Sequence, residues 1–136
     1  MPIVNRTVDV PGVFTSPNYQ HAITVTGRIA FVAGQIALDA NGELVGPGDA
    51  GAQAAQALAN LYAVVRSLGA DWPDVVKFGW YLVDAATGVP AVRSAIETQI
   101  APVLGSVRPA STLVQVAGLF RPELLVEVDA TVCLKD

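Results

Sequence analysis

The chain has 136 residues, of which eight are basic and twelve acidic, and a net charge of −4. The basic residues are scattered, which argues against a nucleic-acid-binding patch, and a single cysteine, Cys133, rules out an internal disulfide and a cysteine-rich metal site. No apolar run reaches membrane-spanning length, so we expect one cytoplasmic domain over residues 1–136 whose excess apolar surface, at a mean hydropathy of +0.48, lies in a subunit interface.

Three strands are expected before the first helix. An extended piece runs from Ile3 to Val10, before Pro11 and Gly12. Two apolar runs follow, Ala22 to Val25 and Ile29 to Val32, and Gly27 between them can supply a tight turn. We therefore expect these two runs to pair as a hairpin.

The first helix is predicted between Asp49 and Gly69. Asp49 is a candidate N-cap, and Gly69 suits the position just after the last turn. A buried stripe is expected from apolar residues at spacings of three and four, namely Leu58, Leu61, Val65 and Leu68.

A strand and a second helix come next. Residues Asp74 to Val83 are predicted to form a long strand. The second helix is expected to begin near Val89 and Pro90, because proline is tolerated in a first helical turn. Its buried face is marked by Val92, Ile96 and Ile100, and residues Pro102 to Gly105 mark its end.

The last quarter of the chain predicts two strands, because residues 108–119 and 124–132 alternate with period two. In the second of them the valines and Ala130 form an apolar face, and Glu127 and Asp129 lie on the reverse side. We expect Ser111 and Gln115 to contribute a hydroxyl and an amide to the same polar sheet face. Either water covers this face, or a second subunit does, with a pocket between the two.

The order of elements predicts an α+β fold with two helices packed on one face of a mixed, mostly antiparallel sheet. Several short stretches, in this order, resemble the Rid, or YjgF-type, reactive-intermediate deaminase family. They are Ala33–Ile36, Gln53–Leu61, Leu68–Asp71, Asp74–Lys77, Pro109–Ala110, Val114–Leu119 and Val126–Val128. The resemblance implies a chorismate-mutase-like subunit in a homotrimer, with the three sheets forming a central barrel and three clefts at the subunit boundaries.

The sequence also departs from the family signature. Active members read Pro-Ala-Arg-Ser, with the arginine gripping the substrate carboxylate, whereas this chain has Ser111 at the arginine position and Thr112 after it. Leu113 stands where a cysteine is common. The resemblance aligns Glu127 with the acidic residue that positions the attacking water and Tyr19 with a tyrosine of the family's site.

The resemblance makes Glu127 and Tyr19 the catalytic candidates. Without it, Glu127 reads equally well as a solvated or ion-paired strand carboxylate. Since serine cannot form the bidentate clamp of an arginine, either the substrate lacks that carboxylate or another cation, such as Arg108, reaches the cleft. The ligand-binding candidates are Gly34, Arg108, Ser111, Thr112, Leu113 and Gln115.

Three functions remain open from the sequence. The first is hydrolysis of a small imine or enamine to a carbonyl compound and ammonia, with no metal or organic cofactor. The second is a pathway-specific relative with an altered substrate or chemistry. The third is a non-catalytic trimer that binds a small molecule. In all three the expected partners are a small molecule and further copies of the chain, with no nucleic acid and no membrane.

Overall fold

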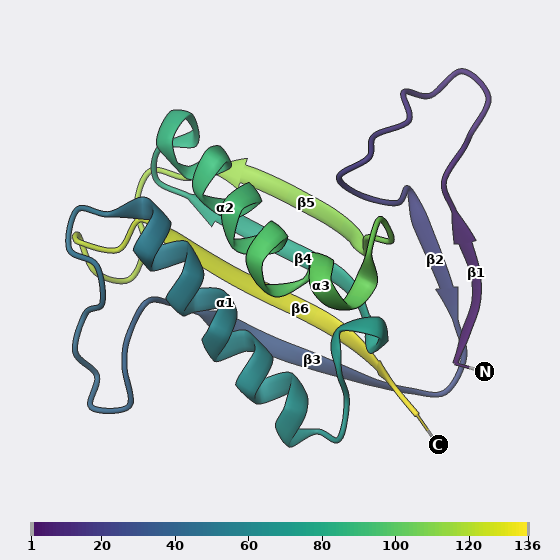
Figure 1. The fold of residues 1–136 in the computed structure, drawn as a ribbon, viewed down its shortest axis with the longest axis horizontal. Coiled ribbons are helices and arrows are strands. Elements are labelled where there is room, and N and C mark those ends of the chain that lie inside the picture. The colour runs from purple at the N-terminus through teal and green to yellow at the C-terminus, as the bar shows by residue number, and fades with distance from the viewer. Residues whose placement is uncertain (1, 136) are drawn as a thin grey trace.

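A computed structural model describes residues 2–135 as six strands, two long helices and two short helical turns (Figure 1). In chain order they are β1 (Ile3–Thr7), β2 (Ala22–Val25), β3 (Arg28–Gln35), α1 (Ala50–Ser67), the 3-10 turn η1 (Trp72–Asp74), β4 (Val75–Leu82), α2 (Ala85–Gln99), α3 (Ala101–Leu104), β5 (Ala110–Gln115) and β6 (Val126–Leu134).

The strands form two sheets. The larger has the order β3-β6-β4-β5, with β6 antiparallel to both of its neighbours and β4 parallel to β5. This confirms a mixed, mostly antiparallel sheet. The smaller sheet is the antiparallel β1–β2 ribbon, which stands apart from the larger sheet in Figure 1.

The predicted hairpin between residues 22–25 and 29–32 is wrong. Strand β2 pairs with β1, while β3 pairs with β6. Gly27, with φ of +105°, redirects the chain from one sheet into the other, and the N–H of Thr26 donates to the carbonyl of Pro2 at 2.7 Å. Gly27 therefore turns the chain, but β2 and β3 pair with β1 and β6 and not with each other.

Helix α1 covers the sheet as its apolar stripe predicts. Asp49 caps it by accepting the N–H of Ala52 at 3.0 Å, and Gly69, with φ of +77°, follows its end. Leu58, Leu61 and Val65 are fully buried, whereas Leu68 at the C-cap is 40% exposed, so the stripe ends one turn earlier than predicted.

Helix α2 begins at Ala85, four residues before the predicted start, and Pro90 lies inside it. The earlier start is possible because the N–H of Ala85, which has no partner within the helix, donates to Gln115 Oε1 at 2.9 Å. The ordinary helical bonds then begin with the Gly88 N–H donating to the Asp84 carbonyl at 2.8 Å. Val92 and Ile100 of the predicted face are buried, and Ile96 is half-buried.

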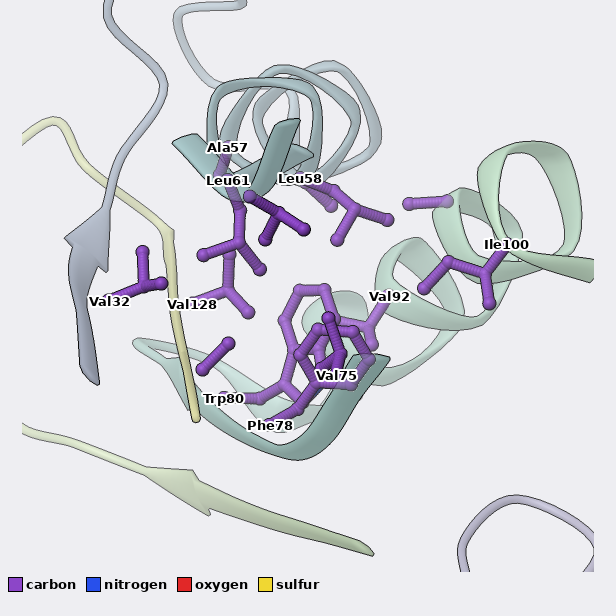
Figure 2. Close-up of a cluster of buried hydrophobic side chains, with 14 of the residues drawn as sticks. Val32, Ala57, Leu58, Leu61, Val75, Phe78, Trp80, Val92, Ile100 and Val128 are labelled. Atoms are coloured by element: carbon purple, nitrogen blue, oxygen red, sulfur yellow. The ribbon is translucent and has the colours of Figure 1, made fainter. Parts of the chain in front are cut away.

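The core lies between the helices and one face of the larger sheet. Figure 2 shows Leu58 and Leu61 of α1 directed toward Val128, Phe78 and Trp80 of the sheet. The alternation of β6 is confirmed, since Val126, Val128, Ala130 and Val132 are all buried. By alternation, Glu127, Asp129 and Thr131 point to the opposite face. We call it the open face because no further layer formed by residues 2–135 covers it (Figure 1).

The expected placement of Ser111 and Gln115 on the face of Glu127 is wrong. They are register partners of Phe78 and Leu82 on β4, whose side chains face the helices. Polar residues are tolerated there because β5 is the edge strand of the larger sheet, and none of its residues is buried. Thr112, paired with Gly79, alternates to the open face.

Candidate functional site

Two carboxylates lie on the open face of the sheet, on strand β6. Asp129 pairs in register with Gly79 of β4, and Glu127 pairs with Tyr81. The hydroxyl of Tyr81 donates to Asp129 Oδ2 at 2.8 Å. A Cβ on Gly79 would collide with Asp129 Oδ1 and lie 2.9 Å from the Tyr81 hydroxyl oxygen, so this glycine makes room for the pair.

The carboxyl group of Glu127 has a raised pKa. Partial burial raises the pKa of its carboxyl group, and the negative charge of Asp129 raises it further. Among residues 2–135 its carboxylate has no hydrogen-bond or ion-pair partner. Its oxygens are therefore free to receive a proton or to hold a water molecule.

Gly34 borders Glu127 directly. Strand β3 has a register irregularity between Val32 and Gln35, and Gly34 lies within it. A Cβ at this position would collide with Oε2 of Glu127. The structure thus brings together Gly34 and Glu127, two of the candidate residues predicted from the sequence.

Tyr81 completes the open-face cluster of Gly34, Gly79, Tyr81, Glu127 and Asp129. The hydrogen bond to Asp129 raises the pKa of the Tyr81 hydroxyl most, with a smaller contribution from burial. The hydroxyl therefore keeps its proton at neutral pH and remains the donor to Asp129. The sequence analysis missed this partnership, because it depends on the register between β4 and β6.

The other predicted residues gather around a hollow between α2 and β5, which we call the α2–β5 pocket. Its volume is about 550 Å³. Its apolar lining is Trp80, Val89, Val92, Ile96 and Leu113. Its polar lining is Asn18, Tyr19, Arg93, Glu97, Arg108, Ser111 and Thr112. Pockets of this size and composition are typical of small-molecule sites.

Tyr19 reaches the pocket from the loop that joins β1 to β2. The neighbouring Gln20 donates its N–H to the carbonyl of Pro109 at 3.1 Å, just before β5 begins. This bond fixes the loop beside the edge strand. The ring of Tyr19 contacts His21 edge-on, with 5.7 Å between the ring centroids, and its hydroxyl has no hydrogen-bond partner among residues 2–135.

Arg108 lines the same pocket as Ser111. It precedes β5, so its direction does not follow the strand. Its Nη1 donates to the carbonyls of Gly105 at 2.6 Å and Val107 at 2.9 Å, and its Nη2 lies 3.4 Å from Glu97 Oε1. The guanidinium of Arg108 is therefore already bound by groups of its own chain.

The predicted site is therefore divided within one chain. Tyr19, Arg108, Ser111, Thr112 and Leu113 border the α2–β5 pocket. Glu127 and Gly34 lie at the open face, with strand β4 between β6 and β5. Gln115 belongs to neither group, because it serves the N-terminus of α2.

Arg93 was missed by the sequence analysis. It lies on α2, four residues after Val89 and four before Glu97, and all three line the pocket. Such i, i+4 spacing places side chains on one helix face, so the pattern was visible in the sequence. What the sequence could not provide was the proximity of this face to β5.

Neither a metal site nor a membrane span is found in the part of the chain that the structure describes. Residues 2–135 contain no group of three or more histidine, cysteine, aspartate or glutamate side chains able to hold a metal ion. None of the described helices combines the length and the apolar character needed to cross a bilayer.

The family model described as Endoribonuclease L-PSP matches residues 13–134. A RutC family protein of Synechocystis sp. is 38% identical over 117 residues, which are 85% of each chain. The crystal structure of YyfB from Yersinia pestis, a protein of unknown function of the conserved Rid protein family, is 38% identical with a TM-score of 0.84, covering 95% of this chain and 98% of its own. The YjgF gene product of E. coli, 24% identical over 96% of this chain and 94% of its own, has a TM-score of 0.69 and shows a shared fold. By fold and by sequence, the chain belongs to the Rid, or YjgF-type, family.

Proposed function

We propose that this protein hydrolyses a small imine or enamine to a carbonyl compound and ammonia in a cleft between subunits. The observation that carries the proposal is the unpartnered, half-buried Glu127 beside Gly34, with a raised carboxyl pKa. A base of this kind suits a reaction in which water attacks an electrophilic carbon.

The reaction proceeds through addition and elimination. An enamine first tautomerises to its imine. Glu127 accepts a proton from water while the water oxygen bonds to the carbon of the imine, which solvent has protonated on nitrogen, and the carbon–nitrogen π pair moves to the nitrogen. The proton on Glu127 then passes to the amino group of the resulting carbinolamine, which becomes an ammonium group. The carbon–nitrogen bond breaks, ammonia leaves with the bonding pair, and loss of the hydroxyl proton forms the carbonyl group.

Association of chains is part of the proposal, because the open face lacks a covering layer. Large apolar side chains are exposed there: Phe31 is 83% exposed, Val114 is 40% and Ile29 is 39%. Burying such side chains favours association by about 25 cal/mol per Å². The homotrimer that the family resemblance implies covers this face and gives Glu127 a route to the β5 residues of a neighbouring chain.

Hydrolysis is tested by generating 2-aminoacrylate or 2-iminopropionate in the presence of the protein and measuring ammonia release. We expect acceleration by the wild type and a loss of about 10²- to 10⁴-fold in Glu127→Gln. Glu123→Gln, an exposed loop carboxylate, is the matched control and should retain the rate. Equal rates with and without protein would reject the proposal.

The oligomeric state needs its own measurement. Light scattering coupled to size-exclusion chromatography should give three times the chain mass of 14.1 kDa. A monodisperse monomer would contradict the proposed cleft, since Glu127 and Ser111 do not share a face of one chain.

Binding of a small molecule without turnover is the second candidate. The α2–β5 pocket favours it, because it has the volume and apolar lining of a binding site and lies away from Glu127 within the chain. Saturable ligand binding by a protein that does not accelerate ammonia release would support this alternative.

A further inference from the structure

Arg93 is the cation in the α2–β5 pocket that is left without a partner. It lines the pocket from α2, and no hydrogen bond or ion pair to it is present among residues 2–135. Arg108, by contrast, is engaged by two backbone carbonyls and Glu97, and its side chain is 11% exposed. An anion entering the pocket therefore finds Arg93 free to bind it.

The charge of the pocket favours an anion. Two arginines and one glutamate, Arg93, Arg108 and Glu97, give a local net charge of +1 in a chain whose net charge is −4. Because the rest of the surface is acidic overall, this local excess distinguishes the pocket electrostatically. A planar guanidinium matches a carboxylate in shape as well as charge.

Much of the remaining pocket lining is apolar and comes from α2, β4 and β5. Trp80 and Val92 are almost fully buried, and Leu113 on β5 is 39% exposed. Leu113 occupies the strand position two residues after Ser111, so both side chains face the same way. A ligand whose carboxylate reaches Arg93 can therefore lay an apolar tail against the valines, the indole and Leu113.

Hydroxyl groups near the pocket are free to orient such a ligand. Tyr19 and Ser111 border the space, and neither hydroxyl has a hydrogen-bond partner among residues 2–135. Thr112 also lines the pocket, but its side chain alternates to the open face. A hydroxyl can donate to a carbonyl, an imine nitrogen or a carboxylate oxygen. Together with Arg93, they supply the few polar groups that a mainly apolar site uses to fix orientation.

We propose that the α2–β5 pocket binds a small monocarboxylate with an apolar tail and that Arg93 of α2 anchors its carboxylate. The carboxylate anchor thus comes from helix α2, whereas the family signature places it on the strand, at the position of Ser111. Ligand binding requires no chemistry at Glu127. A ligand of this kind indicates the substrate class only if the proposed hydrolysis holds, and to that extent the inference rests on the proposed function.

The probe for the binding test is 4-methyl-2-oxopentanoate, titrated into the full-length protein by calorimetry at moderate salt. Two comparison compounds separate the two halves of the site. Pyruvate has the carboxylate without the tail, and 4-methyl-2-pentanone has the same tail with a methyl group replacing the carboxylate. We expect both to bind roughly tenfold or more weakly than the probe, because each lacks one set of contacts.

Variants then locate the anchor. Arg93→Gln should weaken binding of 4-methyl-2-oxopentanoate roughly tenfold to a hundredfold, the range for a lost hydrogen bond to a charged group. Arg28→Gln is the matched control, since Arg28 is exposed and donates to the Lys135 carbonyl away from the pocket. Leu113→Asp places a negative charge on the tail-binding wall and should also abolish binding, while the exposure of Leu113 keeps the fold tolerant.

Distinct outcomes separate this inference from the proposed hydrolysis. Equal affinity of the wild type and Arg93→Gln, or equal affinity for the ketone and the acid, would overturn the Arg93 site. Ammonia release that depends on Glu127 without binding of 4-methyl-2-oxopentanoate would also overturn it, while leaving the hydrolysis intact. Binding that depends on Arg93 and persists in Glu127→Gln, without any turnover by the wild type, would support the site and reject the hydrolysis.

Discussion

The open face and the α2–β5 pocket are built by different means. On the open face, Glu127, Asp129 and Tyr81 are fixed by the register of two central strands. The pocket instead has walls from a helix, an edge strand and the loop that carries Tyr19. Strand register holds the carboxylates in place, whereas single side chains set the shape and charge of the pocket. Keeping the open-face carboxylates while varying the side chains of the pocket is a physical route to altered substrates on a shared fold.

Gly34→Ala should give the largest effect among the variants that test this contrast. The new Cβ collides with the end of the Glu127 side chain, which can rotate away at little cost in stability but then leaves its working position. We expect imine hydrolysis to fall by roughly 10- to 100-fold, since a displacement of about 1 Å has effects of this size. Ammonia-release kinetics and calorimetric binding of 4-methyl-2-oxopentanoate should be measured together, and the binding should not change.

Gly118→Ala is the control for that substitution. Gly118 lies in the loop before β6, and a Cβ there meets no atom within 4 Å. Its rate should equal that of the wild type. If both alanine variants lose the same activity, the loss reflects a general effect of glycine replacement and the contact with Glu127 is irrelevant.

Ser111→Arg should change the pocket without changing the open face. A third cation in the pocket, added to Arg93 and Arg108, shortens the apolar space and adds charge-assisted hydrogen bonds to a carboxylate. We expect 2-iminopropionate hydrolysis to rise by roughly tenfold, while binding of the branched acid weakens. Ser111→Met fills similar space without charge and should not accelerate the small substrate. An arginine variant with unaltered selectivity would show that Ser111 does not border the ligand.

Asp129→Asn should shift the pH dependence of the reaction. The negative charge of Asp129 raises the pKa of Glu127, so its removal lowers that pKa. Glu127 then stays ionised to lower pH, and the acidic limb of the rate profile moves toward lower pH. The amide oxygen can still accept from Tyr81, which preserves the geometry. An unchanged acidic limb would mean that another group controls it.

Much of the fold could be predicted because local signals were strong. Asp49 and Gly69 mark the ends of α1, and the alternating valines of β6 fix which side chains face the helices. The partner of β2 was mispredicted because two apolar runs around a glycine resemble a hairpin, and only the pairing of β3 with β6 distinguishes the alternatives.

The candidate site could be predicted only in part from the sequence. The family resemblance identified Glu127 and Gly34, and the structure places them in contact. It could not show that Ser111 alternates to the other face, because that depends on the parallel register of β5 with β4. Arg93 and Tyr81 were not predicted, because their neighbours on β5 and β6 are distant in sequence.

Gln115→Leu should have the smallest effect, confined to stability. Gln115 accepts the N–H of Ala85, and Asp84 at the N-cap of α2 makes no side-chain capping bond, so the amide replaces the missing cap. We expect a loss of about 1 kcal/mol in the free energy of unfolding, measured in urea at fixed protein concentration because assembly contributes to stability. Gln115→Glu keeps an acceptor and adds a charge that favours a helix N-terminus, so it should preserve stability. Destabilisation of both variants alike would assign the role of Gln115 to packing on β5 instead of to capping, and would remove the physical link between the edge strand and the helix that carries Arg93.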